Sequence, residues 1–218
     1  MNPKELYESC REAREELAYF MRRLYERGLT TCSGGNLSVR VGAGHVIITP
    51  SALDKGRMTG EQIGLLTLGG ENLTPQLKAS MEARMHLRVY EGRPDVRAVV
   101  HAHPVTATSF SAMSADIDTR LTAEAYAILG VPVKAPYALM GTDGLAEEVA
   151  AAVKGADVVI LENHGILTVG PSLLSAFDRL EVLEAAAKMN IITTLMGGVS
   201  PMNGKRIAEL DAWRAARK

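Results

Sequence analysis

The chain has 218 residues, of which 47% are hydrophobic and 22% are charged, a composition typical of a globular domain and unlike that of a disordered or fibrous protein. Its 24 basic and 25 acidic side chains leave a net charge of −1, and 5% of residues are aromatic, which argues against nucleic acid as a partner. No apolar run reaches the roughly 18–20 residues that cross a bilayer, and the charged N-terminal segment lacks the apolar stretch of a signal peptide. We therefore expect a single domain over residues 1–218, no membrane partner, a cytoplasmic location, and free thiols at Cys10 and Cys32.

Helix signals open the chain. Asn2 is a typical helix cap and Pro3 fits the first helical position, while Gly28 is a typical stop. Apolar residues recur at spacings of three and four between them, so we expect one amphipathic helix. After the small residues of 30–36, the turn chemistry predicts a hairpin of strands at 37–41 and 45–49. Residues 54–72 are rich in turn formers.

The rest of the chain alternates helices with strands. The strongest strand signals are the apolar runs at 96–103 and 157–161, and the latter forms a hairpin with 166–169. A short strand is expected at 131–133. Helices are expected within 73–90 and at 122–129, 144–153 and 172–196, with a last one from about Lys205. This alternation predicts a single α/β sandwich in which helices cover a sheet.

The chemical signal that stands out most is His101-Ala102-His103 at the end of a buried strand. Residues two apart on a strand point to the same face, so the two imidazoles lie side by side. Buried imidazoles need polar partners, and a shared divalent metal satisfies both. The alternative is a pair of hydrogen-bonded core histidines.

A third histidine, His164, lies at another strand–turn junction. Three histidines from two strand ends predict a tetrahedral zinc site with one open position, the pattern of catalytic zinc. Glu82 precedes the His-x-His strand and is either a fourth ligand, a general base or a solvated helix residue. It is also one helical turn from His86, a rival metal pair, but we interpret His86 as structural and His45 as a surface residue.

Residues Ser33-Gly34-Gly35-Asn36 form a loop of small residues. Their backbone N–H groups could cradle an anion such as phosphate, although a plain turn is the alternative. The loop has neither the spacing of a Walker motif nor the strand–helix context of a dinucleotide fingerprint. Other polar side chains in similar surroundings are those of Ser51, Lys78 and Ser80.

Six short motifs occur in order along the chain: Ser-Gly-Gly-Asn-Leu-Ser-Val-Arg at 33–40, Ile-Thr-Pro-Ser at 48–51, Ser80-x-Glu82-x-x-x-His86, Arg93-Pro94-Asp95, His101-x-His103-Pro104 and Asn163-His164-Gly165. Each is weak alone. Together and in this order, they resemble the class II aldolase/adducin family over about residues 5–200, nearly the whole chain.

The resemblance implies an α/β/α sandwich with a central, mostly antiparallel sheet, and a cyclic homotetramer with active sites between neighbouring subunits. It implies an aldolase that reversibly cleaves a ketose 1-phosphate, such as L-fuculose 1-phosphate, into dihydroxyacetone phosphate and an aldehyde through a metal-stabilised enediolate. Glu82 would leave the metal and act as the acid/base. The implied Zn²⁺ ligands are Glu82, His101, His103 and His164, and the implied phosphate site comprises Gly35, Asn36, Ser51, Ala52, Ser80 and Met81.

The sequence departs from the family pattern in two places. Met81 stands where a second serine usually precedes the glutamate, which removes one hydroxyl contact to phosphate. Residues 121–123 lack the expected tyrosine, although Tyr126 follows one turn later, and no tyrosine follows Tyr137, so the acid that protonates the aldehyde oxygen is unassigned. Alternatives on the same scaffold are a sugar-phosphate 4-epimerase, a decarboxylase of a phosphorylated keto acid and a dehydratase. More distant alternatives are a metal-dependent hydrolase and a non-enzymatic, adducin-like interaction module.

Overall fold

The computed structural model describes residues 2–216 and contains one seven-stranded sheet in the order β3-β2-β1-β4-β7-β6-β5. Neighbouring strands are antiparallel except for the parallel pair β5–β6. The strands are β1 (Asn36–Val41), β2 (His45–Ile48), β3 (Gly64–Thr67), β4 (Ala98–Ala102), β5 (Val133–Ala135), β6 (Val158–Leu161) and β7 (Gly165–Gly170). The mostly antiparallel sheet is therefore confirmed.

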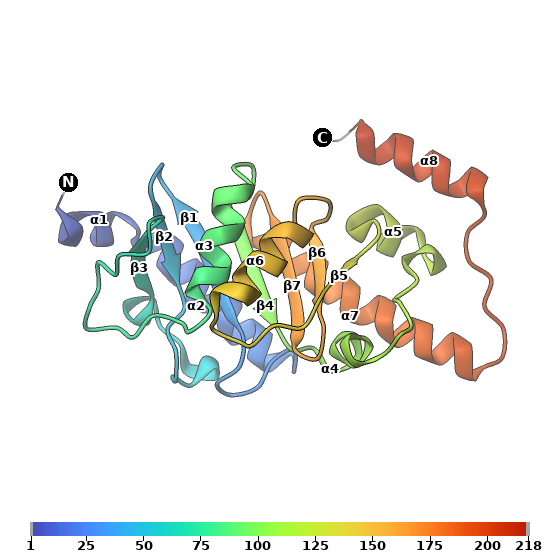
Figure 1. Ribbon diagram of the computed structural model, residues 1–218, viewed down its shortest axis with the longest axis horizontal. Coiled ribbons are helices and arrows are strands. Elements are labelled where there is room, and N and C mark those ends of the chain that lie inside the picture. The colour runs from blue at the N-terminus through green and yellow to red at the C-terminus, as the bar shows by residue number, and fades with distance from the viewer. Residues whose placement is uncertain (1, 217–218) are drawn as a thin grey trace.

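Helices cover both faces of this sheet, as Figure 1 shows. They are α1 (Pro3–Ser9), α2 (Arg11–Glu26), α3 (Ala83–Gly92), α4 (Val105–Ser109), α5 (Ala123–Leu129), α6 (Asp143–Ala152), α7 (Leu173–Leu195) and α8 (Gly204–Ala215). Helices α3 and α6 pack on one face, and α2 and α7 pack on the other. The expected α/β/α sandwich is thus confirmed.

The central strand β4 shows why its sequence is apolar throughout. Val99 belongs to the core cluster beneath α3 and α6, whereas Val100 belongs to the cluster beneath α2 and α7. Successive side chains of a strand point to opposite faces, so a strand covered on both faces has no polar side. His101 follows the same alternation, so its side chain points to the same face of the sheet as that of Val99. The start of α3 lies on this face.

The first helix differs from the prediction. Its cap at Asn2 is as expected, with the side chain accepting from the backbone N–H of Glu5 at 2.9 Å, but the helix breaks at Cys10, whose φ and ψ are −90° and 11°. At the break the Tyr7 carbonyl accepts two hydrogen bonds, one from the backbone N–H of Cys10 at 3.3 Å and one from Nε of Arg14 at 3.2 Å. The tighter bond from Cys10, three residues on, ends the first helix.

The middle of the chain contains one strand that was not predicted and one helix that was. The turn-rich stretch 54–72 includes β3, in which Leu65 pairs with Ile47 of β2, and the helix expected within 73–90 is α3, which starts at Ala83. Ala79 lies before this helix and forms a bridge with Pro50. The residues just before α3 therefore lie against the 48–51 motif.

The two cysteines are free thiols as expected, with Cys10 buried and Cys32 exposed. Over residues 2–216, no helix combines the length and the apolar character needed to cross a membrane.

Candidate active site

Three histidines meet at one edge of the sheet. His101 is the next-to-last residue of β4, His103 lies just after the strand, and His164 lies in the turn between β6 and β7. One nitrogen from each imidazole lies within 4.8 Å of the others, and the Nε2 atoms of His101 and His103 are 3.2 Å apart. The predicted side-by-side arrangement is confirmed, and the turn brings the third histidine to it.

The carboxylate of Glu82 completes this cluster. Its Oε2 lies 3.3 Å from Nε2 of His101, and its Oε1 lies 3.2 Å from Nε2 of His164. Glu82 is the N-cap residue of α3 rather than a residue inside the helix, and its residue exposure of 8% excludes the solvated alternative. The start of α3 therefore sets the carboxylate directly over the end of β4.

These four side chains fit a zinc ion. Zinc ligands lie about 2.0–2.2 Å from the ion in a tetrahedron, which places neighbouring ligand atoms about 3.3 Å apart. The His101–His103 spacing of 3.2 Å is close to this value, as are the 3.3 and 3.2 Å that separate His101 and His164 from the two different carboxylate oxygens of Glu82. His101 is also oriented for coordination, because its Nδ1 donates to the Ile166 carbonyl at 2.9 Å and leaves the Nε2 lone pair facing the cluster.

Protonation states at the cluster also suit a metal. Burial lowers the pKa of His101 and of His103, so both imidazoles are neutral at pH 7. Burial alone would raise the pKa of Glu82, but hydrogen bonds from His164 and Asn36 favour its ionised form, and the pKa lies below its ordinary value. Neutral imidazoles and an ionised carboxylate are the forms that bind metal ions.

His86 and His45 lie outside this cluster. His86 is fully buried on α3, and its two ring nitrogens face Ser38 Oγ at 2.7 Å and Asn36 Oδ1 at 2.5 Å, so neither nitrogen faces the three histidines. Burial lowers its pKa to about 4. His45 is half-buried at the start of β2. The geometry favours the structural interpretation of His86 over the rival metal pair.

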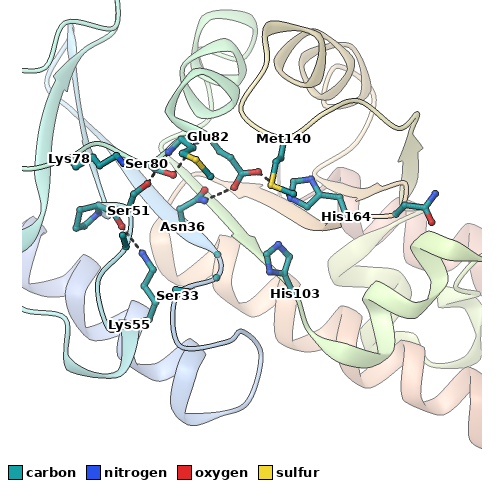
Figure 2. A pocket seen from close by; sticks show the side chains of 16 residues that line it. Ser33, Asn36, Ser51, Lys55, Lys78, Ser80, Glu82, His103, Met140 and His164 are labelled. Carbon is teal, nitrogen blue, oxygen red and sulfur yellow. Dashed lines mark hydrogen bonds and ion pairs between the residues drawn. The ribbon is translucent and has the colours of Figure 1, made fainter.

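A pocket of about 520 Å³ opens beside the cluster (Figure 2). His103, His164 and Glu82 form one part of its wall, and the small-residue loop forms another. The six residues expected at the phosphate site all line it: Gly35, Asn36, Ser51, Ala52, Ser80 and Met81. The structure therefore brings the two predicted half-sites into one cavity, with His101 buried behind its wall.

Two chain segments are joined along the pocket wall. The backbone N–H of Met81 donates to Ser51 Oγ at 3.1 Å, and that of Ser51 donates to the Lys78 carbonyl at 3.1 Å. The Met81 side chain is 62% exposed at the pocket, so it offers an apolar surface where a second serine was expected. The Asn36 side chain faces Glu82 instead of open space, donating to Oε2 at 2.7 Å.

Backbone strain is concentrated at this pocket. Among residues 2–216, the non-glycine residues with positive φ are Ala52 at 57° and Asn163 at 52°, and both line the cavity. A left-handed conformation costs an alanine roughly 1–2 kcal/mol. Such strain persists where the surrounding structure enforces it, and it is common at functional sites.

Sequence reasoning missed Lys55, which also lines the pocket. The residue is 1% exposed, and its Nζ donates to the Pro50 carbonyl at 2.7 Å. Burial lowers its pKa to about 8, so the amine remains mostly protonated at pH 7. No carboxylate within the described part of the chain forms an ion pair with it. One signal could have found it: Lys55 follows the 48–51 motif by four residues.

Comparison with known proteins places this geometry in a family. The sequence profile described as "Class II Aldolase and Adducin N-terminal domain" matches residues 15–191. An L-fuculose phosphate aldolase of Methanococcus maripaludis is 36% identical over 169 residues, which cover 78% of this chain and 91% of that protein. A 3-oxo-tetronate 4-phosphate decarboxylase of Haemophilus influenzae is 33% identical over 181 residues, covering 81% and 85% of the two chains.

A solved structure agrees with the sequence comparisons. An L-fuculose 1-phosphate aldolase superposes with a TM-score of 0.84 at 30% sequence identity, covering 91% of this chain and 94% of that one. The family profile and the structural match each span most of the chain. The chain belongs to the class II aldolase and adducin N-terminal domain family, as a member of its class II aldolases.

Proposed function

We propose that this chain is a zinc-dependent aldolase that reversibly cleaves a ketose 1-phosphate of the L-fuculose 1-phosphate type into dihydroxyacetone phosphate and an aldehyde. The observation that carries the proposal is the single pocket that holds both the Glu82–histidine cluster and the predicted phosphate loop. Similarity to the Methanococcus aldolase, at 36% identity, supports the substrate type.

The pocket orients such a substrate by its two ends. Gly35, Ser51 and Ser80 line the end proposed for phosphate, and the buried ammonium of Lys55 supplies a positive charge there. His103 and His164 line the other end. A phosphate held at the first end keeps the reacting carbons beside the cluster, which reduces the entropic cost of the reaction.

Zinc would be held by His101, His103 and His164, with Glu82 as the fourth ligand at rest. When bound, the ion supplies a Lewis acid that stabilises negative charge on substrate oxygens. Glu82 carries the proton that moves to or from carbon. As the bond between C3 and C4 breaks, the C4 hydroxyl gives up its proton to solvent and its oxygen becomes the aldehyde carbonyl. The electron pair of the broken bond stays on C3, and Glu82 protonates that carbon. In the synthetic direction the Glu82 carboxylate removes the same proton.

We also infer a homotetramer with active sites between neighbouring subunits. Apolar side chains are exposed beside the pocket, with Met81 at 62%, Leu139 at 60% and Met140 at 56%. Clustered apolar side chains on a surface are typical of interfaces with other chains. Met81 and Met140 line the pocket, so a neighbouring subunit covering them would also close the substrate site.

The direct test measures release of dihydroxyacetone phosphate from a panel of ketose 1-phosphates, including L-fuculose 1-phosphate and a 5-deoxypentulose 1-phosphate. Release that stops with a chelator and returns with zinc supports the proposal, and the best substrate defines the aldehyde.

The His103→Ala variant should lose zinc and nearly all activity. A purified variant that keeps both would remove His103 from the metal site.

A second candidate is a decarboxylase of a phosphorylated keto acid. It is favoured by 33% identity to the 3-oxo-tetronate 4-phosphate decarboxylase of Haemophilus influenzae. Both reactions place negative charge on a carbon beside a carbonyl, so the same cluster serves either one. Carbon dioxide release from a 3-oxo-tetronate 4-phosphate, without triose phosphate release from any ketose 1-phosphate, would establish this alternative.

A further inference from the structure

A continuous chain of buried hydrogen bonds runs from α3 and β1 to Glu82. Tyr90 Oη lies 2.8 Å from Ser38 Oγ, which lies 2.7 Å from Nδ1 of His86. Nε2 of His86 lies 2.5 Å from Asn36 Oδ1, and Asn36 Nδ2 donates to Glu82 Oε2 at 2.7 Å. All five residues are buried, and Ser38 and His86 have no exposed surface.

Helix α3 and strand β1 place these side chains opposite one another. Glu82, His86 and Tyr90 are spaced by four residues, so they follow one face of α3 from its N-cap. Asn36 and Ser38 are two residues apart on β1 and point to the same face of the sheet. The α3 face therefore lies along the β1 side chains, and each polar group meets a partner from the other element.

The direction of every hydrogen bond follows from Glu82. An ionised carboxylate only accepts, so Asn36 must present its Nδ2 to Glu82 and its Oδ1 to His86. Nε2 of His86 must then carry the proton, which leaves Nδ1 as an acceptor for the Ser38 hydroxyl. His101 shows the opposite tautomer, with its proton on Nδ1 facing the Ile166 carbonyl.

We propose that His86 is a positioning residue whose Nε2–H fixes the Asn36 amide, so that Asn36 donates to Glu82 and holds its carboxylate at the histidine cluster. The idea rests on the proposed role of Glu82 as a metal ligand and acid/base. Groups that orient metal ligands in this way typically change metal affinity about 10–100-fold when they are removed. The effect should therefore be visible in zinc binding itself, apart from any reaction.

Two substitutions of equal length separate positioning from packing. Gln places a donor nitrogen as many bonds from Cβ as Nε2 of His86, whereas Met places a methyl group there. We expect His86→Met to weaken zinc binding about tenfold or more in competition with a fluorescent chelator, and His86→Gln to stay within about threefold of the unmodified protein. Thr168→Val, which removes a buried hydrogen bond to the Ala176 carbonyl, controls for general loss of stability and should bind zinc normally.

Two measurements remain informative if His86→Met does not fold. Asn36→Ala should weaken zinc binding to the same extent, because it removes the donor that His86 orients. The ¹⁵N spectrum of histidine-labelled, zinc-free protein should show a neutral imidazole protonated at Nε2, assigned by its loss in His86→Gln. Protonation at Nδ1 of His86, or equal zinc affinity in His86→Gln and His86→Met, would overturn the inference. Failure of the unmodified protein to bind zinc would instead count against the proposed function.

Discussion

Glu82 is the residue on which the proposed chemistry depends. It lies 3.3 Å from His101 and receives a hydrogen bond from Asn36 at 2.7 Å. Glu82→Gln keeps the size of the side chain but removes its charge and its proton-transfer capacity. We expect the fold to persist and kcat to fall about 10²–10⁴-fold. Turnover and melting temperature should be measured beside Glu91→Gln, an exposed change on the same helix. Full turnover in Glu82→Gln would remove Glu82 from the reaction.

Lys55 is the next residue whose role can be tested separately. If its ammonium pairs with the substrate phosphate, Lys55→Gln should weaken inhibition by inorganic phosphate about tenfold or more, the usual size of a lost charge-assisted hydrogen bond. KM should rise more than kcat falls. Lys205→Gln, on the exposed face of α8, serves as the control. Unchanged phosphate inhibition in Lys55→Gln would restrict Lys55 to anchoring the Pro50 carbonyl.

The buried histidines make stability depend on pH. The folded-state pKa of His86 is about 4, against 6.5 for the free side chain, so the unfolded chain binds more protons between these values. The free energy of unfolding therefore falls as the pH drops below about 6.5. By pH 5, His86 alone accounts for a loss of about 2 kcal/mol relative to pH 7.5. Urea unfolding of zinc-free protein should show this loss, and His86→Gln should reduce it. An equal pH dependence in both proteins would refute the assignment.

The site was predictable from sequence where spacing alone decides direction. His101 and His103 lie side by side because they are two apart at the end of a strand, and this needs no knowledge of the rest of the chain. The pairing of Glu82 with Asn36 could not be predicted, because it depends on how α3 lies along β1. Lys55 was missed for a similar reason, since its burial results from contacts distant in sequence.

At the scale of elements, the turn between β6 and β7 controls the metal cluster. A Cβ placed on Gly165 would lie 2.9 Å from the Ala102 carbonyl and would collide with Cδ2 of His103. Gly165→Ala should therefore displace the His103 ring, weaken zinc binding at least tenfold and lower the free energy of unfolding by about 1–3 kcal/mol. Chelator competition and urea unfolding measure both effects.

Gly44 offers the matched control for this substitution. It lies in the turn between β1 and β2, and a Cβ there meets nothing within 4 Å. Gly44→Ala should change the free energy of unfolding by no more than about 0.5 kcal/mol and leave zinc affinity unchanged. Equal zinc affinity in the two alanine variants would show that the His103 ring adapts, and that the close approach of Gly165 is not required.

Element boundaries show where local sequence loses its predictive power. The hairpins and α7 were predicted because their turns, caps and periodicity are local. Strand β3 was missed because its four residues, Gly64–Thr67, pair with β2 by contacts that the turn-rich sequence around them does not reveal. The break at Cys10 was missed because the apolar spacing continues through it. Beside the break, Arg14 donates to the Tyr7 carbonyl and to the Gly60 carbonyl, 46 residues away, which local sequence does not reveal.

At the scale of the whole molecule, the end of α7 is poorly covered in a single chain. Leu195 and Met196 are 81% and 80% exposed, and Ile192 and Val199 are about half exposed. Figure 1 shows this end of α7 extending beyond the sheet, with α8 folding back toward α5. Contiguous exposed apolar residues of this kind favour association with another chain.

A tetramer that buries this surface would have four times the 23.4 kDa mass of one chain. We expect light scattering to give about that mass, and Leu195→Glu with Met196→Glu to reduce it because charged side chains cannot be buried there unpaired. If a neighbouring subunit completes the pocket, the dissociated variant should still bind zinc, because all four proposed ligands come from one chain, but should lose at least tenfold in turnover. Leu174→Glu, at the opposite end of α7, controls for the added charge. A monomeric unmodified protein would contradict the tetramer, whereas a dissociated variant with full turnover would place the whole active site within one subunit.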